Sequence, residues 1–154
     1  MSGENVALLR RWFEEVWNRK RLEAIAEMAS PDCVGHGQAE HAVVIGLGQF
    51  EQFARGLQTA FPDMRVKIDF AFEQGDRIVA RWTATMTHTG PFLKIGPTGR
   101  QATVTGTTIV KIANGRIVEG WDNWDQLGLL VQIGAVEPVS FVPPSHEVQQ
   151  AKAS

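Results

Sequence analysis

Two aspartates that follow tryptophans form the part of this chain best suited to chemistry. In EGWDNWDQLGLLVQIG, residues 119–134, Trp121 precedes Asp122 and Trp124 precedes Asp125. A carboxylate in water is a weak base, but apolar neighbours disfavour its charged form and make it a stronger proton acceptor. The stretch therefore either ends a strand with solvated polar groups or holds a carboxylate in a dry cavity for general base catalysis.

The face of the predicted strand decides which aspartate enters such a cavity. Successive side chains of a strand alternate between its faces, so Asp125 shares a face with Trp121 and Asn123. Asp122 lies on the other face, together with Trp124. We favour Asp125 as the cavity carboxylate and expect Asp122 to face solvent or a subunit interface. A β-bulge in this strand would break the alternation.

Histidines are the next candidates for proton transfer. His36 in CVGHG and His88 in MTHTG lie beside glycine, and each is a candidate catalytic residue. Each is also open to a structural interpretation, in which the imidazole hydrogen-bonds the backbone and fixes a loop. His41 has a weaker case, and His146 lies in the C-terminal tail. The histidines and the single cysteine lack metal-ligand spacing, so we expect no metal site.

Composition indicates one soluble globular domain. The chain has 154 residues, of which 44% are hydrophobic and 21% charged, and its formal net charge is −2. The sequence contains no basic run, so we expect no nucleic-acid partner. It contains neither an apolar stretch of membrane-spanning length nor a secretory signal, so we expect no membrane partner. The single cysteine, Cys33, excludes an intrachain disulfide, and we expect a cytoplasmic location.

Hydrophobic periodicity divides the chain into a helical first part and a strand-rich second part. Apolar residues recur at helical spacing in three segments, residues 4–19, 21–29 and 47–60. The period changes to two in four segments, residues 64–73, 76–88, 100–112 and 115–125. Gly75-Asp76 and Asn114-Gly115 predict hairpin turns, and residues 126–134 predict a short helix or turn.

Helices followed by an antiparallel meander predict an α+β fold. We expect a curved antiparallel sheet wrapped around the N-terminal helices, which forms a cone with an internal pocket. Four residues are candidates for substrate binding in that pocket, namely Trp121, Asn123, Trp82 and Phe53. We assign residues 1–134 to this single domain and residues 135–154 to a partly flexible C-terminal extension.

These motifs resemble those of the SnoaL-like polyketide cyclase family, within the nuclear-transport-factor-like α+β cone superfamily. The resemblance spans about residues 5–134 and is carried by SPDCVGHG, AFPDMRV, GDRIVARWTATMTHTGPF and PTGRQATVTGTTIVKIANGRIVEGWDNWDQLGLLVQIG. It implies an enzyme without metal or redox cofactor, which closes a ring by intramolecular aldol condensation of a small apolar carbonyl compound or polyketide-like ester. The family's base is an aspartate at the end of the last strand, and the matching position is Asp125.

Two other functions compete with the cyclase hypothesis. The first is a non-catalytic module of the same fold that binds a small apolar ligand or mediates dimerisation. The tryptophan-flanked carboxylate argues against it, because burying a charge costs free energy. The second is a limonene-type epoxide hydrolase. Such enzymes use an Arg-x-Asp motif and a tyrosine, whereas this chain has Arg81-Trp82-Thr83 and no tyrosine.

The expected partners are a small apolar carbonyl-containing substrate and further copies of the chain. Apolar residues alternate on the outward strand face, where we place Val118 and Trp124. Such a face is too apolar for open water. We therefore expect a homodimer or a dimer of dimers.

Overall fold

Helices occupy much of the N-terminal half, in the order that the apolar spacing predicts. The computed structural model describes residues 3–39 and 42–138. Within these ranges the helices that precede the meander are α1 Glu4–Trp12, the π-helix η1 Phe13–Asn18, α2 Ala24–Met28 and α3 Gly46–Ala60. The helices predicted over residues 4–19 and 47–60 are confirmed, and α2 is shorter than its prediction over residues 21–29.

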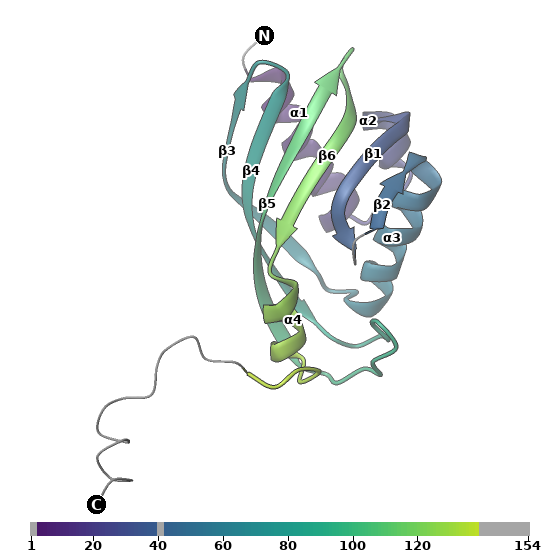
Figure 1. Ribbon diagram of the computed structural model, residues 1–154, viewed down its shortest axis with the longest axis vertical. Coiled ribbons are helices and arrows are strands. Elements are labelled where there is room, and N and C mark those ends of the chain that lie inside the picture. Colours follow the sequence, from purple (N-terminus) through teal and green to yellow (C-terminus); the bar gives the residue numbers. More distant parts are fainter. Residues whose placement is uncertain (1–2, 40–41, 139–154) are drawn as a thin grey trace, which may run out of the picture.

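Six strands of the described chain form one sheet in the order β2-β1-β6-β5-β4-β3 (Figure 1). Their bounds are β1 Ala29–Ala39, β2 Ala42–Ile45, β3 Arg65–Gln74, β4 Arg77–Thr87, β5 Gln101–Ala113 and β6 Arg116–Trp124. The meander from β3 to β6 is antiparallel, as predicted. However, β1 pairs parallel to β6, so the sheet is mixed and not wholly antiparallel. No hairpin joins these two strands, and the local sequence therefore gives no signal for their relative direction.

Both predicted hairpin turns are present. Gly75 joins β3 to β4 with a backbone φ of 60°, and Asn114 and Gly115 join β5 to β6 with φ values of 52° and 73°. Positive φ at both central residues is the requirement of the type I′ turn, which explains the Asn-Gly pair. These turns set the register of the meander near its ends.

The helices α1 and α3 lie on the same side of the curved sheet and enclose its inner face (Figure 1). Burial along β4 and β5 alternates residue by residue, because one face of each strand points inward and the other outward. Leu9, Val16, Met28 and Ile78 are fully buried members of one hydrophobic cluster that joins the helices to the sheet. The predicted α+β cone is therefore confirmed, with the parallel β1–β6 pair as its unpredicted feature.

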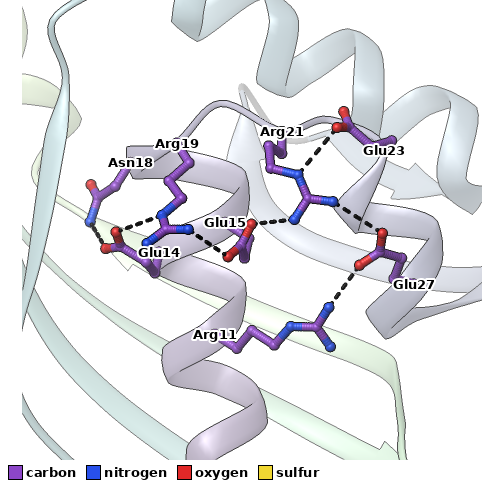
Figure 2. Close-up of polar contacts among 8 residues, drawn as sticks. All are labelled: Arg11, Glu14, Glu15, Asn18, Arg19, Arg21, Glu23 and Glu27. Atoms are coloured by element: carbon purple, nitrogen blue, oxygen red, sulfur yellow. Dashed lines mark hydrogen bonds and ion pairs between the residues drawn. The ribbon is translucent and has the colours of Figure 1, made fainter.

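Charged residues connect the N-terminal helix to α2 across the molecular surface (Figure 2). We call the eight residues of this cluster the surface ion network: Arg11, Glu14, Glu15, Asn18, Arg19, Arg21, Glu23 and Glu27. The Arg21 guanidinium contacts Glu15 and lies 3.2 Å from Glu27, while Arg11 lies 2.7 Å from the other oxygen of Glu27. Arg21 therefore links η1 to α2, and Arg11 links α1 to α2.

The end of η1 is also attached to the sheet. The Asn18 side chain donates to the Val66 carbonyl at 2.9 Å and accepts from the Val66 N–H at 2.7 Å, as a neighbouring strand would. A hydrogen bond of 2.8 Å from the Arg19 N–H to the Glu14 carbonyl has the wide spacing of a π-turn. This geometry fixes where the aromatic residues of η1 meet the sheet.

The last described element is α4, Gln126–Gln132, which confirms the predicted short helix. The proposed C-terminal extension lies outside the described residues from position 139 onward, as do His41 and His146. Across the described ranges, no helix has both the length and the apolar character needed to cross a bilayer.

Candidate active site

A cavity of about 110 Å³ lies between the inner face of the sheet and the helices. Its lining is mostly apolar, with a large aromatic share from Trp12, Phe13, Trp17, Phe50, Phe53, Trp82 and Trp124. The rings pack against one another, and the Trp17 and Phe53 centroids lie 6.2 Å apart in an edge-on arrangement. Apolar cavities with a few placed polar groups are the usual form of small-molecule sites.

One charged residue, Asp122 on β6, belongs to the described lining of this cavity. Thr108 on β5 is its partner across the strands, and the Thr108 hydroxyl donates a hydrogen bond to Asp122 Oδ1. The indole N–H of Trp82 donates in turn to Thr108 Oγ1 at 2.9 Å. Three neighbouring strands thus contribute to one hydrogen-bonded chain that ends on a carboxylate facing an apolar cavity.

Asp125 does not face the cavity. It is exposed, precedes α4 as its N-cap, and its Oδ1 accepts a hydrogen bond of 2.8 Å from the Gly128 N–H. This is the capping role that aspartate favours at a helix start. The prediction that Asp125 and not Asp122 faces the cavity is therefore wrong.

A β-bulge in β6 explains the reversed assignment. Ile112 on β5 pairs with Ile117, but the preceding Lys111 pairs with Glu119, which leaves Val118 as the extra residue. One extra residue exchanges the two faces of the strand beyond it. The inward residues of β6 are consequently Ile117, Gly120, Asp122 and Trp124.

The same bulge places Trp121 and Asn123 outside the cavity lining. Trp121 stacks on His36, with ring centroids 5.7 Å apart and planes inclined by 11°. His36 Nε2 lies 2.8 Å from a carboxylate oxygen of Glu119. The expectation that Trp121 and Asn123 accompany the cavity carboxylate is wrong for the same reason, and His36 is not brought to Asp122.

His88 is fully buried but does not contribute to the cavity lining. Its Nδ1 accepts from the Thr98 backbone N–H at 3.3 Å and lies 3.0 Å from the Thr98 hydroxyl. Its backbone carbonyl accepts from Gly99, and its ring packs against Phe61 at 5.5 Å. These contacts agree with the structural interpretation, in which the imidazole fixes the loop over residues 89–100.

Trp82 and Phe53 lie where the sequence places them, in the wall of the cavity. The sequence interpretation placed Asp122 and Trp124 on the other face of the strand, and it did not single out Thr108, Trp12 or Trp17 as site residues, although they also line the cavity. The helical spacing of Trp12, Phe13 and Trp17 gives one inward face, but it does not distinguish a filled core from a lined cavity.

Cys33 is the second titratable residue in the described lining. Burial raises the pKa of its thiol, and the nearby Asp32 acts in the same direction. The thiol is therefore neutral at neutral pH and a poor nucleophile. Within residues 3–39 and 42–138, no three histidine, cysteine, aspartate or glutamate side chains gather as metal ligands do.

A curved sheet closed by helices around an apolar cavity defines an α+β cone protein. The chain belongs to the SnoaL-like polyketide cyclase family, whose sequence model matches residues 7–133. No curated protein sequence matches this chain.

Three solved structures illustrate what this chain is similar to in fold and sequence. AclR of Streptomyces galilaeus, a proposed hydroxylase, is 29% identical with a TM-score of 0.78, over 97% of this chain and 90% of that chain. A proposed SnoaL-like polyketide cyclase from Jannaschia sp. CCS1 is 26% identical with a TM-score of 0.80, over 89% of this chain and 95% of that chain. IdmH of Streptomyces antibioticus, a proposed polyketide cyclase, is 26% identical with a TM-score of 0.73, over 84% and 97%.

Proposed function

We propose that this protein is a cyclase of the SnoaL-like type, in which Asp122 is the general base. The observation that carries the proposal is the position of Asp122, the charged residue of a described lining that is otherwise mostly apolar and aromatic. A carboxylate has a cost in such a place, and a module that only bound apolar ligands could avoid that cost.

The proposed reaction needs one group that removes a proton and later returns one. Asp122 takes a proton from the carbon next to a carbonyl, and the electrons of that C–H bond form an enolate. The enolate carbon attacks a second carbonyl carbon of the same molecule, which forms the new C–C bond and closes the ring. The resulting alkoxide takes a proton back, and loss of water from the aldol completes the condensation. No redox cofactor takes part in these steps.

The aromatic wall supports a flat, apolar carbonyl compound or polyketide-like ester as the substrate class. Trp17, Phe53 and Trp82 in the lining offer stacking surfaces. In this proposal the substrate folds within the cavity so that its two carbonyl carbons meet.

A matched pair of variants tests the proposal. Asp122→Asn keeps the shape of the side chain, and we expect turnover of a poly-β-ketoester to fall about 100-fold or more, the usual contribution of a general base. Asp125→Asn is the control, because that residue is exposed and caps α4. Wild-type turnover in Asp122→Asn, or loss of turnover in Asp125→Asn alone, would refute the assignment.

Hydroxylation is the second candidate, because the proposed hydroxylase AclR covers nearly the whole chain. The two reactions give different products, since hydroxylation adds one oxygen atom from dioxygen and needs a two-electron reductant to release the other as water, whereas aldol condensation removes water. Mass spectrometry of the product distinguishes them. Epoxide hydrolysis receives no support from the cavity, because Arg81 is outside its described lining and lies 3.3 Å from the Thr107 hydroxyl.

We further propose that the outer sheet face is covered by a second copy of the chain. The prediction of Trp124 on that face is wrong, because Trp124 lines the cavity. Exposed apolar residues of the described sheet instead include Phe70 and Phe72 on β3, which are 55% and 53% exposed. Light scattering should give at least twice the 17.0 kDa chain mass, and Phe70→Lys with Phe72→Lys should give the monomer. A wild-type monomer at micromolar concentration would contradict this proposal.

A further inference from the structure

The cavity carboxylate lies at the end of a hydrogen-bonded chain that crosses three strands. Thr108 on β5 is directly opposite Asp122 on β6, and Gly106 on β5 is directly opposite Trp82 on β4. The indole therefore reaches diagonally along β5, over Gly106, to donate to Thr108 Oγ1 at 2.9 Å. This arrangement points to a role for Trp82 and Thr108 in holding the carboxylate.

The direction of each hydrogen bond follows from the chemistry of the groups. An indole N–H only donates, so Thr108 Oγ1 must accept from Trp82. A threonine hydroxyl carries a single proton, and the Thr108 hydroxyl directs that proton at Asp122 Oδ1. A donor aimed at a carboxylate stabilises its ionised form, which is the form that a general base requires.

Burial protects these hydrogen bonds from competition by water. Trp82 is 9% exposed and Thr108 is 5% exposed, so neither polar group has ready access to solvent as an alternative partner. Val104 and Val110, on the same face of β5, extend the apolar lining on either side. Hydrogen bonds in such surroundings are electrostatically stronger than in water, and the loss of one is more costly.

Gly106 provides an independent observation that the indole has a required position. A Cβ atom on Gly106 would lie 2.2 Å from Cζ2 of Trp82, far inside contact distance. The absence of a side chain at position 106 is therefore what allows the Trp82 ring to lie across β5. Backbone freedom does not explain this glycine, because Gly106 is not among the glycines with positive φ.

We propose that Trp82 and Thr108 are positioning residues that hold Asp122 Oδ1 as an acceptor and keep the carboxylate aimed into the cavity. The inference rests on the proposed function of Asp122 as the base. The alternative is a purely structural role, in which Thr108 only satisfies the buried indole N–H. A structural role predicts effects on stability alone, whereas positioning predicts effects on kcat and on its pH dependence.

Kinetics of Thr108 variants test the inference. Thr108→Val keeps the shape and removes the hydroxyl, and we expect kcat to fall about 10- to 100-fold, as for loss of one hydrogen bond to a charged group. We expect KM to change little and the acidic limb of the kcat/KM profile to move to higher pH, because the ionised carboxylate loses a donor. Thr108→Ser, which keeps the hydroxyl, should have wild-type kcat and a wild-type pH profile. Thr107→Val, on the opposite face of β5, is the matched control.

In Trp82→Phe we expect a smaller fall in kcat and a smaller shift of the acidic limb to higher pH. This variant keeps the Thr108 hydroxyl but frees it to rotate. This variant also serves if Thr108→Val fails to fold. Thr108→Val or Trp82→Phe with wild-type kcat and a wild-type pH profile would overturn the inference. Cys33, the other titratable residue in the described lining, does not affect the acidic limb of the pH profile, because burial raises the pKa of its thiol.

Nuclear magnetic resonance separates this inference from the proposed function, because it needs no turnover. The indole N–H signal of Trp82 should shift as Asp122 titrates between acidic and neutral pH, and the response should vanish in Asp122→Asn. If this response is present but no variant or wild-type protein turns over a poly-β-ketoester, the proposed function fails and the positioning stands. An indole signal that ignores Asp122 overturns the positioning whatever the turnover.

Discussion

The cavity and the molecular surface each carry a polar network, and the two networks differ in almost every physical respect. In the cavity, Trp82, Thr108 and Asp122 form a chain of two hydrogen bonds among apolar side chains. The surface ion network on α1, η1, α2 and the connection between η1 and α2 has more charges and more contacts, and most of its side chains are exposed (Figure 2). The surface ion network therefore has more polar contacts than the cavity, but we expect the cavity contacts to have the larger effect on function.

Solvent explains the difference. An exposed ion pair exchanges one set of favourable contacts for another, so it contributes about 0–1 kcal/mol. A polar group in an apolar cavity has no such exchange available, and leaving it without its partner costs about 1–3 kcal/mol. Few, buried hydrogen bonds consequently constrain the site more strongly than many exposed ion pairs constrain the helices.

The largest effect on stability in this comparison should come from Gly106→Ala. The added Cβ displaces the buried Trp82 ring, and overpacking of this kind costs about 1–3 kcal/mol. The control is Gly48→Ala in α3, where a Cβ meets open space and helix propensity should add about 0.5–1 kcal/mol. Urea unfolding of the pair measures both values, and equal stability of the two variants would contradict the account of Gly106.

A smaller effect is expected from Glu15→Gln in the surface ion network. The Glu15 side chain is 14% exposed and faces both Arg19 and Arg21, so we expect a loss near 1 kcal/mol, the upper end for such pairs. Glu51→Gln is the matched control, because its 2.7 Å pair with Arg55 is a well-exposed helical pair worth about 0.3–0.5 kcal/mol. Both losses should shrink in 1 M salt. Salt-independent losses would show that charge is not their cause.

The smallest effect on stability should be one that depends on pH. Two hydrogen bonds from Thr87, at 2.6 and 2.7 Å, lower the pKa of the exposed Asp63 below its ordinary value of 3.8. Because the pKa is lower in the folded state, this stabilisation is present above the ordinary value and is lost as pH falls through the lowered one. Thr87→Val, which removes one of the two donors, should be destabilised near neutral pH and approach wild-type stability in acid. A deficit that persists in acid would contradict this origin.

Much of the fold was predictable, because hydrophobic periodicity records which face of an element is buried. The helical spacing over residues 47–60 and the alternation over residues 76–88 both gave the observed elements. The parallel pairing of β1 with β6 was not predictable in this way, since it depends on contacts between distant segments. Local sequence also gives no indication of how far α1 and α3 stand from the sheet, and so no indication of the cavity.

One extra residue in β6 explains why the sequence analysis favoured the wrong carboxylate. Counting back from the Asn114-Gly115 turn without interruption pairs Thr108 with Trp121, whereas the extra Val118 shifts its partner to Asp122. Valine is a favourable strand residue, so position 118 carries no signal of a bulge. The one available signal was at Asp125, because aspartate directly before a predicted short helix suits an N-cap.

Proton exchange is the most direct test of the central claim, that Asp122 removes a proton from a carbon next to a carbonyl inside the cavity. An apolar monoketone in D₂O exchanges its α-hydrogens slowly at neutral pH, and the wild-type protein should accelerate this exchange without any need for ring closure. We expect Asp125→Asn to match the wild type and Asp122→Asn to fall about 100-fold or more towards the rate in solvent. Exchange at the wild-type rate in Asp122→Asn would contradict the account.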